Sequence, residues 1–119
     1  MKNSIFETDG LSKTYGLTQA LKISSKIEIP RGKLVCVLGH SGSGKSTLLN
    51  LLALLEDHDR DGQLIFNSHL GKSFDYSKTS EAKKSEIRNR AFSVAFQDGH
   101  LIGHITTLQN IELGMSLAG

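Results

Sequence analysis

The sequence predicts an α/β fold with a parallel sheet, and three observations support this. Apolar residues recur at alternate positions over residues 19–29, which indicates a half-buried strand. Residues 33–38 are apolar at nearly consecutive positions, as expected of a strand buried inside a parallel sheet. This segment leads through a glycine-rich loop into a leucine-rich segment, about residues 45–55, which predicts a helix. Strands that alternate with helices are typical of α/β domains.

The helix over 45–55 carries leucines around most of its circumference, so we expect it to be buried on most sides. Local patterns predict the remaining elements. They are a strand at 4–8, a short strand at 63–67, an irregular polar connection at 68–80, a helix at 81–89 capped by Ser80 or Thr79, a strand at 91–96, and a helix that opens with Thr106-Thr107-Leu108-Gln109.

Length and composition restrict the class of protein. The 119 residues leave room for one domain with one modest core, and 38% hydrophobic with 22% charged residues is typical of a folded soluble protein. A formal net charge of +2 gives no electrostatic support for a nucleic-acid partner. No stretch approaches the roughly 20 apolar residues that cross a bilayer, so we expect no direct membrane insertion. The single cysteine, Cys36, is expected to be a small core residue.

The glycine-rich loop matches the phosphate-binding pattern G-x-x-x-x-G-K-[ST]. Glycines allow backbone angles that turn successive N–H groups toward phosphates, and the following helix directs its positive end at the same anion. The lysine supplies charge for the β and γ phosphates, and the serine hydroxyl after it can ligate Mg²⁺. The predicted nucleotide-binding residues are Gly39, His40, Ser41, Gly42, Ser43, Gly44, Lys45, Ser46 and Thr47.

Together with this loop, two other segments resemble the ATP-binding domain of ABC transporters. Leu11-Ser12-Lys13-Thr14-Tyr15-Gly16 is similar to the family segment that offers an aromatic ring to adenine. Phe96-Gln97-Asp98 is similar to its Q-loop. The C-terminal third, including Leu101-Ile102-Gly103-His104 and Thr106-Thr107-Leu108-Gln109-Asn110-Ile111, resembles the branch of lipoprotein-release and macrolide-export ATPases.

The resemblance implies a P-loop NTPase (RecA-like) core with an N-terminal antiparallel β subdomain, and ATP with Mg²⁺ as cofactors. It assigns Tyr15 to adenine, Lys45 to the phosphates as a catalytic residue, Ser46 to Mg²⁺, and Gln97 to Mg²⁺ or the attacking water. It also implies a transmembrane subunit bound through the Q-loop region and a second ATP-binding subunit in a head-to-tail dimer. The expected location is the cytoplasmic face of the inner membrane, as a peripheral protein.

The family's L-S-G-G-Q signature, Walker B strand and switch histidine do not occur in residues 1–119. We therefore expect this chain to be the N-terminal portion of one ABC ATPase domain. The full-length protein would hydrolyse ATP, whereas the fragment lacks the catalytic glutamate and is expected to be inactive.

Two other functions stay open at this stage. The chain could be a non-catalytic module that binds a nucleotide or a partner, or part of an ABC-type ATPase that is not linked to transport.

Two patterns that resemble metal sites favour simpler interpretations. The turn 57–62 imitates the start of a calcium loop but lacks the acidic twelfth ligand, so a solvated acidic turn is the better interpretation. His100 and His104 have zinc-pair spacing, but Gly99 and Gly103 disfavour the helix that such a pair needs.

Overall fold

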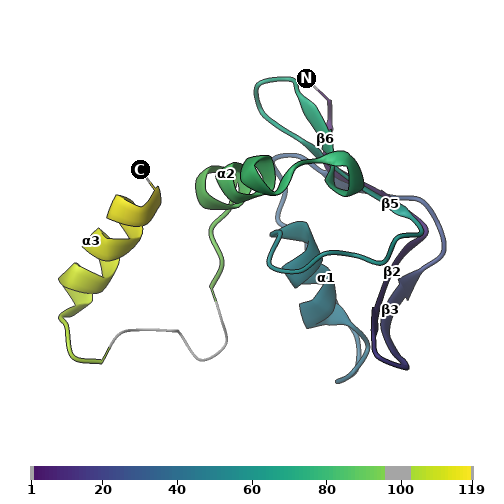
Figure 1. Cartoon of the computed structure of the whole chain (residues 1–119), viewed down its shortest axis with the longest axis horizontal. Coiled ribbons are helices and arrows are strands. Elements are labelled where there is room, and N and C mark those ends of the chain that lie inside the picture. The colour runs from purple at the N-terminus through teal and green to yellow at the C-terminus, as the bar shows by residue number, and fades with distance from the viewer. Residues whose placement is uncertain (1, 96–102, 119) are drawn as a thin grey trace.

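The structure is a computed structural model that describes residues 2–95 and 103–118 (Figure 1). Two antiparallel sheets dominate the N-terminal part of the chain. The larger has the strand order β4-β1-β5-β6 and the smaller is the hairpin β2-β3. The strands are β1 (Ser4–Asp9), β2 (Leu11–Tyr15), β3 (Thr18–Ile23), β4 (Ile27–Pro30), β5 (Gln63–Asn67) and β6 (Ser73–Asp75).

Three α-helices and one 3₁₀ helix complete the described elements: α1 (Lys45–Leu52), η1 (Tyr76–Lys78), α2 (Glu81–Ala91) and α3 (Thr107–Ala118). The predicted caps are confirmed. Ser80 Oγ accepts from the Lys83 N–H at 3.2 Å. Thr106 Oγ1 accepts from the Gln109 N–H at 3.1 Å, while Gln109 Oε1 accepts from the Thr106 N–H at 2.8 Å. Figure 1 shows α3 beyond α2, away from both sheets.

The core lies where the two sheets meet α1, η1 and α2. Its fully buried side chains are Leu11 from β2, Leu51 from α1 and Leu64 from β5. Aromatic rings extend this core, with Phe66 packed edge-on against Phe92 at 5.1 Å between ring centroids. The other buried apolar residues are Phe6, Leu21, Leu52, Leu54, Phe66, Tyr76 and Ile87.

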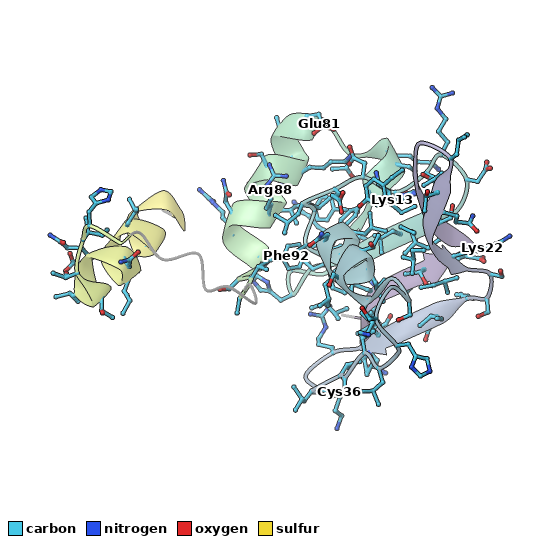
Figure 2. The ribbon with its side chains drawn as sticks, turned by 90° about the horizontal axis from the view of Figure 1, so that it is seen from below. Lys13, Lys22, Cys36, Glu81, Arg88 and Phe92 are labelled. Atoms are coloured by element: carbon cyan, nitrogen blue, oxygen red, sulfur yellow. The ribbon has the colours of Figure 1, made fainter. Side chains whose placement is uncertain are left out.

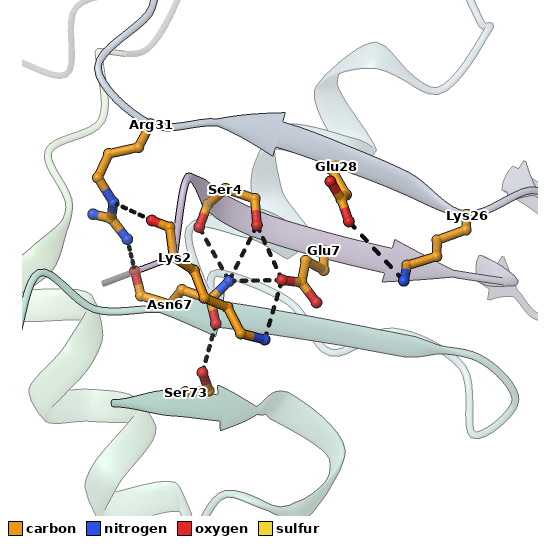
Figure 3. A network of polar contacts seen from close by, with 8 residues as sticks. All are labelled: Lys2, Ser4, Glu7, Lys26, Glu28, Arg31, Asn67 and Ser73. Carbon is orange, nitrogen blue, oxygen red and sulfur yellow. Dashed lines mark hydrogen bonds and ion pairs between the residues drawn. The ribbon is translucent and has the colours of Figure 1, made fainter. Parts of the chain in front are cut away.

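A polar network ties the strands of the larger sheet together (Figure 3). The buried Asn67 donates through Nδ2 to the Ser4 carbonyl and to Glu7 Oε1, both at 3.1 Å, and accepts from Ser73 Oγ at 2.6 Å. The Arg31 guanidinium reaches the Asn67 carbonyl at 2.5 Å. These contacts link β1, β5, β6 and the turn after β4. The hydrogen bond from the Ser4 hydroxyl is the largest cause of the lowered pKa of Glu7.

Helix α1 ends three residues earlier than the predicted 45–55. Leu54 adopts a left-handed φ of 60°. Its N–H donates to the Leu51 carbonyl at 3.2 Å, and the Leu55 N–H donates to the Asn50 carbonyl at 2.9 Å. This is the Schellman arrangement that glycine usually closes. No glycine marks the end of this helix, and burial of the Leu54 side chain offsets the cost of its backbone conformation.

The carboxyl end of α1 is fixed by two side chains from later elements. The Tyr76 hydroxyl donates to the Leu52 carbonyl at 2.9 Å, and Arg88 Nη1 donates to the Leu54 carbonyl at 2.7 Å. Carbonyls at a helix end have no partner within the helix, so these bonds satisfy them and join α1 to η1 and α2.

The predicted strands at 33–38 and 91–96 are wrong over their described residues. Residues 34–38 have no regular structure, and Leu34 and Leu38 are 94% and 88% exposed. Cys36 is exposed as well, on the loop at the outer edge of the molecule in Figure 2. Residue 91 ends α2, and residues 92–95 have no regular structure. A parallel strand needs neighbours to complete its hydrogen bonds, and none of the described segments pairs with residues 33–38.

Other expectations are corrected in detail. All strand pairs among the described residues are antiparallel, and the region 19–29 forms two strands, β3 and β4. The connection 68–80, predicted to be irregular, contains β6 and η1. The helix α1 is not buried on most sides as predicted: Leu51 and Leu52 are buried, whereas Leu49 is 54% exposed.

Candidate nucleotide-binding site

The glycine-rich loop has the backbone that its glycines predict. Gly42 and Gly44 have φ of +82° and +94°, in the left-handed region that other residues seldom adopt. The loop closes on itself through the Ser43 N–H, which donates to the His40 carbonyl at 3.1 Å. A side chain at position 39 would come within 2.5 Å of Ser43 Oγ, so the Ser43 side chain would have to move to admit it.

Lys45 begins α1 and folds its side chain back over the loop. Its ammonium donates to the Gly39 carbonyl and, at 2.9 Å, to the His40 carbonyl. Both acceptors belong to the loop itself. The Lys45 ammonium is therefore held against the loop, where it could contact an anion bound there. The Lys45 ammonium is thus available to exchange these carbonyls for phosphate oxygens, which bind it more strongly.

The amino end of α1 differs from those of α2 and α3. No side chain caps it, and its first turn contains no acidic residue. By contrast, α2 has the Ser80 cap and Glu81 in its first turn, and the Thr106 hydroxyl caps α3. Free N–H groups and the helix dipole leave partial positive charge at the start of α1. This end is therefore suited to an external anion.

A cavity of about 610 Å³ opens at this helix end, between the loop and β3. The β3 strand contributes Thr18, Gln19 and Ala20 to its wall, which the sequence did not predict. These residues lie beside the loop because Gly44 approaches β3 closely, against the Ala20 carbonyl and the Leu21 side chain. The remaining lining residues are Ser41, Gly42, Gly44, Lys45, Ser46 and Thr47.

Tyr15 lies at the end of β2 with 45% of its surface exposed. Its hydroxyl donates to Glu56 Oε1, in the turn after α1. The hydrogen bond to the Glu56 carboxylate is the largest cause of the raised pKa of Tyr15. The same bond lowers the pKa of Glu56. The Tyr15 side chain thus lies beside the turn that follows α1, and it is not among the residues that line the cavity.

The acidic turn after α1 is engaged with β2 rather than simply solvated. The Asp59 carboxylate accepts from the Thr14 N–H at 3.0 Å, the Thr14 hydroxyl at 2.8 Å and the Ser12 hydroxyl at 3.1 Å. The Thr14 hydroxyl is the largest cause of the lowered pKa of Asp59. In the described part of the chain, no three His, Cys, Asp or Glu side chains are grouped to hold a metal ion.

Gln97, Asp98 and His100 lie outside the described residues, so the predicted Q-loop contacts stay predictions. His104 is exposed. Across residues 2–95 and 103–118, no helix is both long and apolar enough to cross a membrane.

A family model described as "ABC transporter" matches residues 24–118. The chain belongs to the ABC transporter family. The dimeric structure of MJ0796, a bacterial ABC transporter cassette, superposes with a TM-score of 0.79 at 28% identity, covering 96% of this chain and 48% of that one. This match establishes the ABC ATPase cassette fold, a P-loop NTPase with an antiparallel β subdomain.

Relatives in the ABC transporter family act in both directions of transport, according to their names. The sulfate/thiosulfate import ATP-binding protein CysA of Synechocystis is 40% identical over 92% of this chain and 27% of its own length. The macrolide export ATP-binding/permease protein MacB of Pasteurella multocida is 34% identical over 95% of this chain and 17% of its own. An uncharacterized ABC transporter ATP-binding protein of Methanocaldococcus jannaschii, MJ1508, is 37% identical. Its match covers 95% of this chain and 49% of MJ1508, so the chain spans half or less of these relatives.

Proposed function

We propose that the chain binds ATP with Mg²⁺ as part of the ATP-binding subunit of an ABC transporter. The observation that carries this proposal is the amino end of α1, which no side chain caps and which faces a cavity beside the Lys45 ammonium. A polyphosphate would complete the hydrogen bonds of this helix end and neutralise the lysine. One relative of the same fold is described as bound to ADP and Pi.

Different residues would contact the phosphates, the Mg²⁺ ion and the adenine of the nucleotide. Residues 39–44 and Thr47 would surround the phosphates, Lys45 would neutralise the β and γ phosphates, and Tyr15 would stack on adenine. Mg²⁺ fits the donor set, because it favours few protein oxygens together with phosphate oxygens and water, and the Ser46 hydroxyl lines the cavity. The bound ion would screen charge between the phosphates. Gln97 would be its second ligand or would orient the attacking water.

The activity of the whole protein is also part of the proposal. Two such subunits would close head to tail around ATP and reopen after hydrolysis, which would drive a transmembrane subunit bound near Gln97. The chain would then be peripheral on the cytoplasmic face of the inner membrane. Residues 1–119 alone would bind nucleotide without turnover, because no residue among them matches the family's catalytic glutamate.

The substitution Lys45→Ala tests the proposal by calorimetry with Mg·ATP. We expect affinity to fall about 10- to 100-fold, as for loss of a charge-assisted contact to phosphate. Lys78→Ala is the matched control. It removes the same charge from η1, which adjoins the opposite end of α1 through Tyr76. Equal ATP affinity in the parent and Lys45→Ala would refute the assignment.

A further inference from the structure

The turn between α1 and β5 holds three consecutive residues of β2. Glu56 accepts the hydroxyl hydrogen of Tyr15, the Asp57 carbonyl accepts from the Lys13 ammonium at 2.6 Å, and Asp59 holds Thr14. The Asp59 N–H also donates to the backbone carbonyl of Ser12 in β2 at 2.9 Å. The end of β2 is therefore fixed to the chain segment that directly follows the phosphate-loop helix.

Glu56 makes a second contact, to α1 itself. Its Oε2 accepts from Asn50 Nδ2 at 3.2 Å. Asn50 lies on the same helix as Lys45, five residues further along. One carboxylate thus joins the tip of the Tyr15 side chain to the helix whose amino end faces the cavity.

The Tyr15 ring is oriented from two sides. Its hydroxyl is held by Glu56, and the Lys13 ammonium lies 5.2 Å from the ring centroid, over one face. A cation over one face is attracted to the ring and occupies that face. In the proposed function, the base would stack on the opposite face.

We propose that Glu56 is a positioning residue for the nucleobase: by bridging Tyr15 and Asn50 it fixes the distance between the aromatic ring and the phosphate loop. This inference rests on the proposed function, in which Tyr15 receives the base. Binding both ends of one nucleotide requires this distance to match the ligand, and a ring fixed in advance loses less conformational freedom on binding.

Affinities for Mg·ATP and for inorganic tripolyphosphate with Mg²⁺ separate this role from a structural one. Tripolyphosphate has the phosphates without the base. Removing the Glu56 charge should strengthen the binding of both anions by electrostatics alone. Positioning instead predicts that Glu56→Ala lowers the ratio of ATP to tripolyphosphate affinity about 3- to 10-fold. Glu28→Ala, which removes an exposed carboxylate on β4, should leave this ratio unchanged.

Two further variants identify the contact. Tyr15→Phe keeps the ring but not the hydroxyl, so it should lower the ratio to a similar extent, and the double variant should be no worse than either single one. Glu56→Gln retains an acceptor and should restore part of the ratio. A parent chain that binds neither ligand would refute the proposed function and this inference with it. If the parent binds ATP but Glu56→Ala changes both affinities equally, or neither, only the positioning role is refuted.

Discussion

The close approach of α1 to β3 can be measured by comparing alanine substitutions at two glycines of the loop. A Cβ at Gly44 would lie 2.7 Å from the Ala20 carbonyl oxygen and 2.9 Å from Leu21 Cδ1, whereas a Cβ at Gly42 would meet nothing within 4 Å. Both glycines have positive φ, so each substitution carries the left-handed conformational cost of about 1–2 kcal/mol. The entropy lost by the unfolded chain, about 0.4–1 kcal/mol, is common to both and cancels in their difference.

Only Gly44→Ala forces backbone and side chain of β3 to move, which adds about 1–3 kcal/mol to the loss of stability. Urea unfolding followed by circular dichroism measures the difference. With a slope of about 1–2 kcal/mol per molar urea, the midpoint of Gly44→Ala should lie about 1 M below that of Gly42→Ala. Equal midpoints for the two variants would refute the contact between the start of α1 and β3.

Two further predictions concern self-association and acid. The exposed Leu34 and Leu38 should make this chain associate with itself at high concentration. A Leu34→Lys, Leu38→Lys double variant should have a lower average mass in light scattering, and an unchanged mass would contradict this. The folded-state pKa of Asp59 lies below its ordinary 3.8, so its contribution to stability is full above pH 3.8 and is lost as pH falls through the lower folded value. Asp59→Asn should therefore flatten the decline of the urea midpoint below pH 3.8, and a decline of unchanged steepness would contradict this role.

Local patterns gave correct predictions where a few neighbouring residues determine the outcome. The loop glycines, the Ser80 cap and the Thr106 capping box depend on backbone angles and contacts within four residues. The end of α1 was missed although it is also local, because Leu54 takes the conformation that glycine usually signals. Its burial, which stabilises that conformation, depends on residues far along the chain.

The wrong and missing predictions depend on distant segments. An apolar run such as 33–38 predicts burial, but it forms a strand only if another segment supplies the hydrogen-bond partners. Glu56 and Gln19 could not be associated with the site from the sequence, because their places follow from how the β2-β3 hairpin packs beside α1. Nothing in the spacing of Tyr15 and Glu56, 41 positions apart, indicates that contact.

The phosphate loop keeps its conformation although the segment before it is not a strand, and the contacts of α1 explain why. The carboxyl end of α1 is bonded to Tyr76 and Arg88, and its amino end fits against β3 so closely that Gly44 has no room for a side chain. Glu56 then fastens Tyr15 to the same helix. Each of these contacts comes from the antiparallel sheets, η1 or α2, and none from residues 33–38. The helix that follows the phosphate loop is therefore positioned at its carboxyl end by Tyr76 and Arg88 and toward the β2-β3 hairpin by Gly44 and Glu56, so the two halves of the proposed ATP site belong to one packed unit.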